Sequence, residues 1–352
     1  MSLDIIAFLT IKSTYEVMIL KIAVDVMSGD HGIKNNIDGC IQAVNEFGVS
    51  LILVGKENEI NTELNKYNYD KKLIEIINAQ DVITNEDKAG MSIRKKKESS
   101  MVKALYLVKE DIAQGVISSG NTGALLSGAT LIVGRIKGIK RPALAPIIPT
   151  EKDGAVLIDA GANVDSKAKY LQQFGIMGSI YAEKVLKKNN PKVGLANIGE
   201  EATKGNLLVR EAFPLLEEAP INFIGSIEIR DVFLGDTNVI VCDGFVGNTI
   251  LKVGEGLAKT IFKTLKMELL KSFKSKIGAF LLKDSFRSLK AHLDYTEYGG
   301  APFLGVNGCV IKAHGSSDAK AIKNAIRQAK DYLENEVTKE IGKAIREIEE
   351  AK

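Results

Sequence analysis

Short apolar runs alternate with longer amphipathic segments along most of this 352-residue chain. The runs are rich in Val and Ile, and most of them end in glycine beside a small polar residue. Such runs, alternating with helical segments, predict βαβ units in which helices cover both faces of a largely parallel sheet. We therefore expect an α/β fold with a doubly wound, mostly parallel sheet. The expected strands are residues 19–26, 49–54, 74–78, 115–118, 155–158, 192–196, 239–242 and 309–313.

The same pattern sets the expected domain organisation. A long final helix is expected after the N-cap residues 316–318, because its apolar positions recur at helical spacing as far as Ile345. No linker rich in Pro, Gly or Ser divides the chain, so we expect a single α/β domain over residues 18–345. Residues 1–17 are interpreted as an N-terminal extension or a misassigned start, because Met18 stands directly before the first expected strand. Their apolar stretch is too short to span a bilayer.

Residues 257–294 depart from this alternation. Leucine and isoleucine recur every four residues from Leu257 to Leu269 with lysines beside them, and the apolar stretch 279–282 precedes a second helical segment. This pattern predicts a protruding amphipathic helix hairpin with a basic face and an apolar tip. Two roles fit such a hairpin: an arm for packing or dimerisation, and reversible contact with an anionic membrane surface.

Composition adds few constraints. Hydrophobic residues make up 45% and charged residues 26% of the chain, as in ordinary globular proteins, and the net charge of +3 indicates no nucleic-acid partner. Cys40, Cys242 and Cys309 lie far apart and lack the spacing of a zinc site or disulfide framework. We therefore expect three buried free cysteines, a reducing cytoplasm and no metal.

Polar residues gather where the expected strands end. Gly together with Asp, Asn, Ser or His follows most of these strands, and ligands of open parallel sheets bind beyond the carboxyl ends of the strands. The same residue types also form turns, but their recurrence at successive strand ends favours a single binding cleft. Asp159 and Asn163 after one strand, and Asp243 after another, are therefore candidate substrate-binding residues.

The segment 118–123 (SSGNTG) joins an expected strand directly to a helix. Backbone amides at such a junction can hold phosphate at the positive end of the helix. Ser119, Gly120, Asn121 and Thr122 are therefore candidate phosphate-binding residues. The segment matches neither GxGxxG nor a Walker A loop, so it indicates neither a dinucleotide nor ATP.

Two further features could serve an anion. His31 follows Asp25 and Asp30 and is a candidate base or phosphate donor, with a structural turn histidine as an equal alternative. The basic run 94–97 precedes a helix expected at 100–110. It fits a solvated charge run and equally a surface that attracts phosphate or an acidic carrier.

Lys204 and Asn248 are candidates for stabilising negative charge at strand ends. Lys204 lies in a glycine-flanked loop after one strand, and Asn248 ends the segment 243–248 (DGFVGN) after another. A lysine in such a loop can neutralise phosphate, or the oxyanion that forms when phosphate attacks a thioester, and the Asn248 amide can donate to that oxyanion. Phosphate is itself a nucleophile, so the chemistry requires no Ser or Cys nucleophile, and the chain has no GxSxG, HExxH or CxxC pattern.

Taken together, these stretches resemble the bacterial acyl-ACP:phosphate acyltransferase family (the PlsX family), in which ACP is acyl carrier protein. Two features depart from the family pattern: Val26 and Ser28 stand where alanine and glycine are common, and the residues before Met18 have no counterpart. The matching stretches follow the family order over residues 19–340 and are 22–32, 94–101, 118–126, 138–145, 159–163, 199–206, 243–248, 298–308 and 313–318.

The resemblance implies a fold like that of isocitrate and isopropylmalate dehydrogenases, a homodimer, and no metal or other cofactor. It places the family's essential lysine at Lys204 and its essential asparagine at Asn248. It also implies a cytoplasmic, peripherally membrane-associated enzyme, which favours lipid contact by residues 257–294.

We hypothesise that inorganic phosphate binds among the 118–123 loop, Lys204 and neighbouring strand-end groups. Phosphate then attacks the thioester of fatty acyl-ACP, while Lys204 and Asn248 stabilise the oxyanion. The acyl phosphate product would supply a membrane glycerol-phosphate acyltransferase in phospholipid synthesis.

Two other interpretations stay open. A metal- and NAD-dependent decarboxylating dehydrogenase would use Asp159, Asp236 and Asp243 for a divalent ion, and fold analogy alone supports it. A membrane-binding scaffold would use the basic hairpin, but it would leave the strand-end clusters without a purpose.

Overall fold

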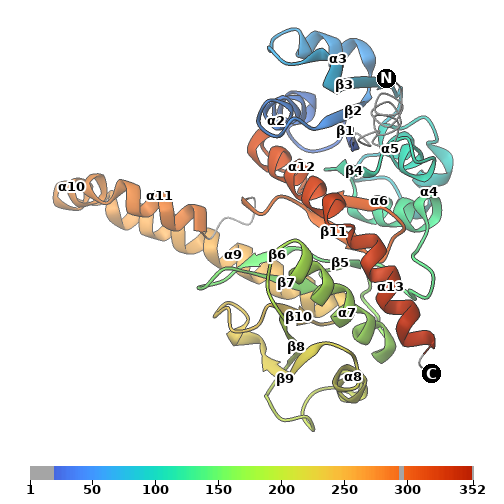
Figure 1. The fold of residues 1–352 in the computed structure, drawn as a ribbon. Helices are drawn as coiled ribbons and strands as arrows, with labels where there is room; N and C mark the ends of the chain where they lie inside the picture. Colours follow the sequence, from blue (N-terminus) through green and yellow to red (C-terminus); the bar gives the residue numbers. More distant parts are fainter. Residues whose placement is uncertain (1–19, 293–296, 351–352) are drawn as a thin grey trace, which may run out of the picture.

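The computed structural model describes residues 20–292 and 297–350, and their strands form two sheets, of seven and five strands (Figure 1). The prediction of an α/β fold with mostly parallel strands is confirmed. The prediction of one doubly wound sheet is wrong, because the strands divide between two sheets. The division falls between β5 (Ala143–Leu144) and β6 (Ile147–Pro149), each at the edge of its sheet and too short to give a clear sequence signal. The predicted extension, residues 1–17, lies outside the described residues.

The seven-stranded sheet has the order β3-β2-β1-β4-β12-β11-β5. Its first five strands are parallel, and β11 runs antiparallel to both of its neighbours. The remaining strands of this sheet are β1 (Lys21–Asp25), β2 (Ser50–Gly55), β3 (Ile74–Asn78), β4 (Gly115–Ser118), β11 (Ala301–Leu304) and β12 (Cys309–Lys312).

The five-stranded sheet has the order β6-β7-β10-β8-β9. Only β6, at one edge, is antiparallel. The carboxyl ends of the other strands therefore lie along one edge of this sheet. Those strands are β7 (Gly154–Ile158), β8 (Lys192–Asn197), β9 (Asn222–Glu228) and β10 (Val239–Val241).

Helices connect the parallel strands, as expected for βαβ units. The two helices at the chain's C-terminal end cross the seven-stranded sheet and α7 (Figure 1). The helices of the body are α2 (Gly32–Phe47), α3 (Glu57–Leu64), α4 (Ala89–Lys95), α5 (Ser100–Lys109), α6 (Thr122–Gly128), α7 (Ala168–Lys184), α8 (Leu207–Glu217), α12 (Ala319–Glu334) and α13 (Val337–Glu350).

Helices cover both faces of the seven-stranded sheet. Ile22 and Val24 of β1 pack in one apolar cluster with residues of α2 and α12, while Ala23 packs in another with residues of α5. Alternate residues of one strand thus meet helices on opposite faces. This arrangement explains why β1 and β2 appear in the sequence as continuous apolar runs.

The long final helix that the sequence predicts is two helices, α12 and α13. Glu336 has a φ of 48°, and a left-handed residue ends an α-helix. The break turns α13 so that Val337 and Ile341 are fully buried. Helical periodicity continues across the break in the sequence, so the sequence did not reveal the change of direction.

An arm of helices projects from the body of the molecule (Figure 1). It comprises the outer part of α9 (Gly244–Leu269), with α10 (Phe273–Leu281) and α11 (Lys283–His292). These elements occupy the segment in which the sequence predicts a helix hairpin, and residues 293–294 of that segment lie outside the described residues. Among the described helices, none combines the length and apolar character needed to cross a bilayer.

Candidate active site

Asp25, Ser118 and Lys312 end three neighbouring parallel strands, β1, β4 and β12. The register pairs Asp25 with Ser118 and Ser118 with Lys312, so the three side chains lie in a row on one face. Asp25 Oδ2 accepts hydrogen bonds from Ser28 Oγ (2.6 Å) and Ser118 Oγ (2.7 Å). The carboxyl end of the seven-stranded sheet therefore presents a row of polar groups, in which a hydrogen bond joins Asp25 and Ser118.

The start of the 118–123 loop is fixed by internal hydrogen bonds. The Gly120 N–H donates to Ser118 Oγ (3.1 Å), and Ser119 Oγ donates to the carbonyl of Ser28 (2.7 Å). Ser119 and Gly120 thus lie at the predicted sheet edge, but the Gly120 amide is already bonded to the protein.

Asn121 also bonds within the protein. Its Oδ1 accepts from the Ala124 N–H (2.9 Å) and caps α6, and its side-chain amide donates to the carbonyl of Asn85 (3.4 Å). Thr122 begins α6, which is only seven residues long. The loop therefore offers fewer free amides than the sequence predicts, and phosphate needs a further positive group.

His31 lies at the same sheet edge. It is exposed immediately before α2, and its ring makes no hydrogen bond within the described part of the chain. The neighbouring Asp30 N–H donates to the carbonyl of Gly315 (2.7 Å), which joins the loop after β1 to the loop after β12. His31 is thus available to a ligand at the edge of this polar row.

Asp159 organises the corresponding edge of the five-stranded sheet. Its buried carboxylate accepts from the N–H groups of Leu144 (2.9 Å), Ala162 (3.0 Å) and Asn163 (2.6 Å) and from the Asn163 side-chain amide (3.0 Å). Burial raises the pKa of this carboxyl group, and the hydrogen bonds oppose that shift. Asp159 and Asn163 therefore position the loop that follows β7.

Asp243 orients the helix that carries Asn248. Its Oδ1 accepts two hydrogen bonds of 2.9 Å from N–H groups in the first turn of α9, and the Gly244 N–H donates to the carbonyl of Asn163 (2.8 Å). Asn248 follows in the next turn, where it is exposed. A Cβ atom added at Gly161 would lie 3.6 Å from Asn248 Cβ, so Asn248 faces the loop after β7.

Lys204 lies in an acidic environment beyond β8 and β9. It is exposed, and its Nζ is 2.7 Å from Glu201 Oε2. The hydrogen bond with Glu201 raises the pKa of Lys204 and lowers that of Glu201. Lys204 lines a hollow of about 400 Å³ together with Glu200, Glu201 and Glu228.

Helix α9 links the two groups of strand ends. Burial lowers the pKa of His314 in the loop after β12, and the charge of Lys252 on α9 adds to that shift. Lys252 is four residues after Asn248, so both lie on one side of α9. The charge of Lys252 thus acts on the loop after β12, whereas Asn248 itself faces the loop after β7. No hydrogen bond among the described residues joins Lys204 to Asn248.

Sequence reasoning missed Lys312. Its partly buried Nζ donates to the carbonyl oxygens of Ser119 (3.3 Å) and Ala313. The available signal was its position, directly between the buried run 309–311 and the polar segment 313–318.

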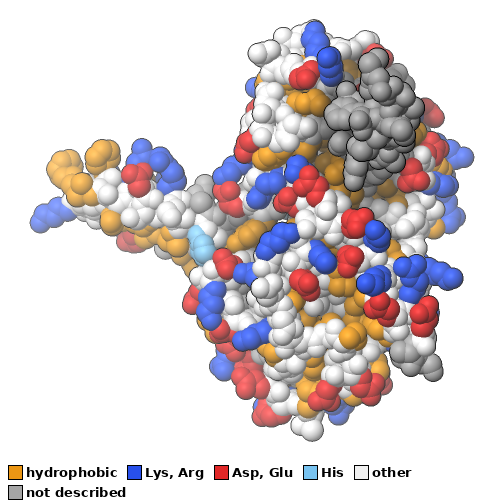
Figure 2. Space-filling view, in the orientation of Figure 1, with side chains coloured by type: hydrophobic (Ala, Val, Ile, Leu, Met, Phe, Trp, Pro, Cys, Tyr) orange, Lys and Arg blue, Asp and Glu red, His pale blue; other side chains and the backbone are white. Residues whose placement is uncertain are grey.

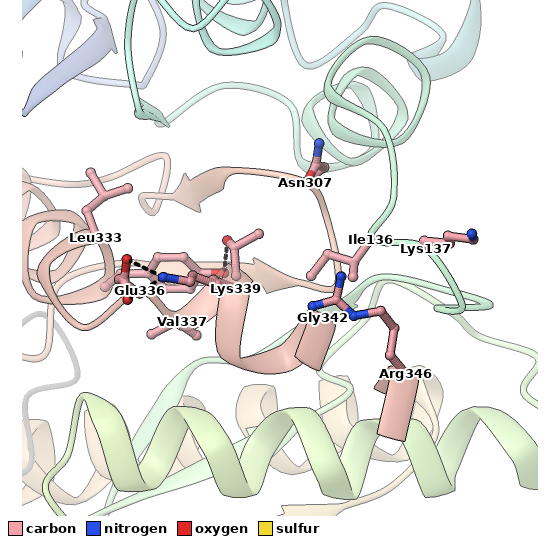
Figure 3. Close-up of a pocket in the computed structure, with 11 residues that line it drawn as sticks. Ile136, Lys137, Asn307, Leu333, Glu336, Val337, Lys339, Gly342 and Arg346 are labelled. Atoms are coloured by element: carbon pink, nitrogen blue, oxygen red, sulfur yellow. Dashed lines mark hydrogen bonds and ion pairs between the residues drawn. The ribbon is translucent and has the colours of Figure 1, made fainter. Parts of the chain in front are cut away.

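A separate cavity of about 460 Å³ lies between α13 and the loop that contains Ile136 and Lys137 (Figure 3). Glu336 and Lys339 form an ion pair in its lining. Its lining includes none of the sequence-predicted site residues.

The family model described as "Fatty acid synthesis protein" matches residues 20–340. A protein from Alkaliphilus oremlandii named phosphate acyltransferase is 55% identical over 326 residues, which cover 93% of this chain and 97% of that protein. A protein of the same name from Clostridium novyi is 54% identical over 323 residues, with coverage of 92% and 97%.

The fold is also similar to that of a phosphotransacetylase from Streptococcus pyogenes, with a TM-score of 0.62, 18% identity, and coverage of 95% of this chain and 100% of that one. At this identity the likeness concerns the fold alone. The family model matches most of the chain, and both relatives are more than 50% identical to it. These matches confirm the family that the sequence motifs predict. The chain belongs to the fatty acid synthesis protein family of phosphate acyltransferases and is an acyltransferase.

Proposed function

We propose that this enzyme transfers a fatty acyl group from acyl carrier protein to inorganic phosphate. The observation that carries the proposal is the identity of 54–55% with relatives named phosphate acyltransferase over more than nine-tenths of the chain. The polar row at the ends of β1, β4 and β12 supports it, because ligands of parallel sheets bind beyond the carboxyl ends of the strands.

The proposed step needs no covalent enzyme intermediate. An oxygen of hydrogen phosphate attacks the thioester carbon and forms the C–O bond, and the C–S bond then breaks. The proton of the phosphate passes to the thiolate that leaves, so the products are acyl phosphate and the free carrier thiol. Asn248 and Lys204 stabilise the oxyanion between these two events.

Lys204 requires a local rearrangement for this role. In the structure its ammonium is paired with Glu201. An exposed ion pair of this kind contributes only about 0.2–1 kcal/mol, so an arriving acyl donor can separate it. Asn248 needs no such release, because it is exposed and its side-chain amide makes no hydrogen bond within the described residues.

The proposed donor and pathway rest on the family's description and on the motif resemblance. The family is described as a fatty acid synthesis protein, and acyl carrier protein holds the thioesters of that synthesis. The product, acyl phosphate, would be the substrate of a membrane glycerol-phosphate acyltransferase in the synthesis of phosphatidic acid.

The arm supports a further part of the proposal, a cytoplasmic homodimer that binds membranes peripherally. Apolar side chains of the arm are exposed (Figure 2); Phe273 is 79%, Phe280 74% and Leu281 76% exposed. Lysines lie among them on α9 and α10. Exposed apolar area beside basic residues suits an anionic lipid surface. The exposed Val253, Leu257 and Ile261 of α9, nearer the body, suit a second copy of the chain.

The experiment that tests the function uses purified protein, palmitoyl-ACP and phosphate, without added nucleotide or metal. The expected result is release of carrier thiol in proportion to a hydroxylamine-reactive product, and none without phosphate. Equal turnover of palmitoyl-coenzyme A would refute the carrier protein as the specific donor. NAD reduction with hydroxy acids, without thiol release, would replace the proposal with the dehydrogenase alternative.

A further inference from the structure

Lys312 is the one member of the Asp25–Ser118–Lys312 row that carries a positive charge. Ser118 is its register partner on β4, and Asp25 is the register partner of Ser118 on β1. The row stands where the loops after β1, β4 and β12 meet, since Asp30 of the first loop bonds to Gly315 of the third. A cation at this position faces the place where parallel sheets bind ligands.

The hydrogen bonds of Lys312 leave it capacity for a ligand. A lysine ammonium has three N–H donors, and Nζ of Lys312 donates to two carbonyl oxygens, those of Ser119 and Ala313. Within the described residues it forms no ion pair. The two carbonyls fix the direction of the side chain, and one donor stays free.

The surroundings favour an anion at that donor. Burial lowers the pKa of Lys312 to about 8, and Lys252 on α9 adds to this shift, while Asp30 and Asp25 oppose it. The carboxylate of Asp25 is occupied by Ser28 and Ser118. A partly buried ammonium without a directly paired carboxylate is costly, and a bound dianion would relieve that cost.

Lys204, the cation that the sequence favours for phosphate, has the opposite environment. It is paired with Glu201 and shares its hollow with Glu200 and Glu228. Three carboxylates repel a phosphate dianion more strongly than a singly charged oxyanion, because the repulsion scales with the charge. The two lysines therefore suit different parts of the reaction.

We propose that Lys312 is the principal cation of the inorganic phosphate site, at the carboxyl ends of β4 and β12. This inference rests on the proposed function and deepens it. Lys312 binds the nucleophile, and Lys204 and Asn248 act on the carbonyl oxygen of the acyl donor. Phosphate is thus held at the carboxyl end of the seven-stranded sheet.

The test measures phosphate binding by calorimetry, and the KM for phosphate at saturating acyl-ACP, in Lys312→Met and Lys312→Arg. The Met variant is expected to lose about 10- to 100-fold in phosphate affinity, the range for one charge-assisted hydrogen bond, with an unchanged KM for acyl-ACP. Lys343→Met on α13 is the matched control. Wild-type affinity in a folded Met variant overturns the inference.

The pH dependence gives a second readout. Wild-type phosphate affinity is expected to fall as the pH rises through about 8, because Lys312 loses its charge there. The Arg variant keeps its charge and is expected to lack that fall. A fall of equal size in the wild type and the Arg variant overturns the inference, even if the Met variant does not fold. Calorimetry needs no acyl donor, so it separates failure at Lys312 from failure of the proposed reaction.

Discussion

Oδ1 of Asp159 accepts a 2.9 Å hydrogen bond from the backbone N–H of Leu144. Asp159 follows β7 of the five-stranded sheet, and Leu144 belongs to β5 at the edge of the seven-stranded sheet. One buried carboxylate thus joins the two sheets at the end where the site residues gather.

Removing this carboxylate is expected to destabilise the protein. Asp159→Ala leaves the N–H groups of Leu144, Ala162 and Asn163 without their acceptor, at a cost of about 2–4 kcal/mol in the free energy of unfolding. Urea denaturation measures the difference. Asp165→Ala is the control, because Asp165 is exposed in the same loop. Equal urea midpoints for Asp159→Ala and Asp165→Ala would contradict the role of Asp159 in joining the two sheets.

Lys204→Ala is expected to lower turnover by about 10²–10³, the cost of losing an oxyanion donor, with the fold intact. The lysine is exposed, so its loss leaves no buried group unpaired. Steady-state thiol release measures the effect. Lys192→Ala, at the opposite end of β8, is the matched control. Near-normal turnover in the Lys204 variant would remove this residue from the mechanism.

Asn248→Ala is expected to reduce turnover without changing the melting temperature. Its amide faces the loop after β7 and makes no hydrogen bond within the described residues, so the loss affects the reaction rather than folding. The control is Thr249→Ala, which changes the next exposed position of α9. Parallel losses of activity and stability in Asn248→Ala would indicate a structural role instead.

The arm is expected to govern membrane binding. The double variant Phe280→Ser, Leu281→Ser removes two side chains that are 74% and 76% exposed, so the fold stays stable. Its partitioning onto vesicles with anionic lipid should fall by about 10-fold or more, from the lost apolar burial. Vesicle flotation measures this, with Ser288→Ala on α11 as the control. Unchanged flotation would assign the arm to another contact.

The charge of Lys312 has a consequence for stability. Its pKa is lowered from 10.5 to about 8, so between these values the unfolded chain binds more protons than the native one. Stability from this group therefore rises with pH across that window. Between pH 8 and pH 10, the free energy of unfolding of the wild type should rise by about 1–3 kcal/mol relative to that of Lys312→Met. Denaturation of both proteins at pH 8 and pH 10 measures the gain, and a constant difference would contradict the shifted pKa.

The sequence predicts β3 and β4 to the residue, because each is a short apolar run bounded by polar or glycine residues. It cannot predict the division into two sheets, since β5 and β6 are two and three residues long.

The sequence likewise predicts only part of the candidate site. The sequence locates Asp159 at a strand end, but the donors that surround its carboxylate become visible only in three dimensions. The same holds for Lys204, because Glu228 reaches its hollow from the neighbouring strand β9. Lys312 was missed because a lysine at the end of a buried strand resembles an ordinary strand boundary until its neighbours β1 and β4 are placed beside it.

The most direct test of the central claim uses phosphate labelled with ¹⁸O at all four oxygens. The protein is incubated with palmitoyl-ACP and the labelled phosphate, and the mass of the acyl product is measured by mass spectrometry. The account predicts acyl phosphate that carries the four heavy oxygens, with carrier thiol released in equal amount. Unlabelled free fatty acid as the product would mean that water attacks the thioester, and it would contradict acyl transfer to phosphate.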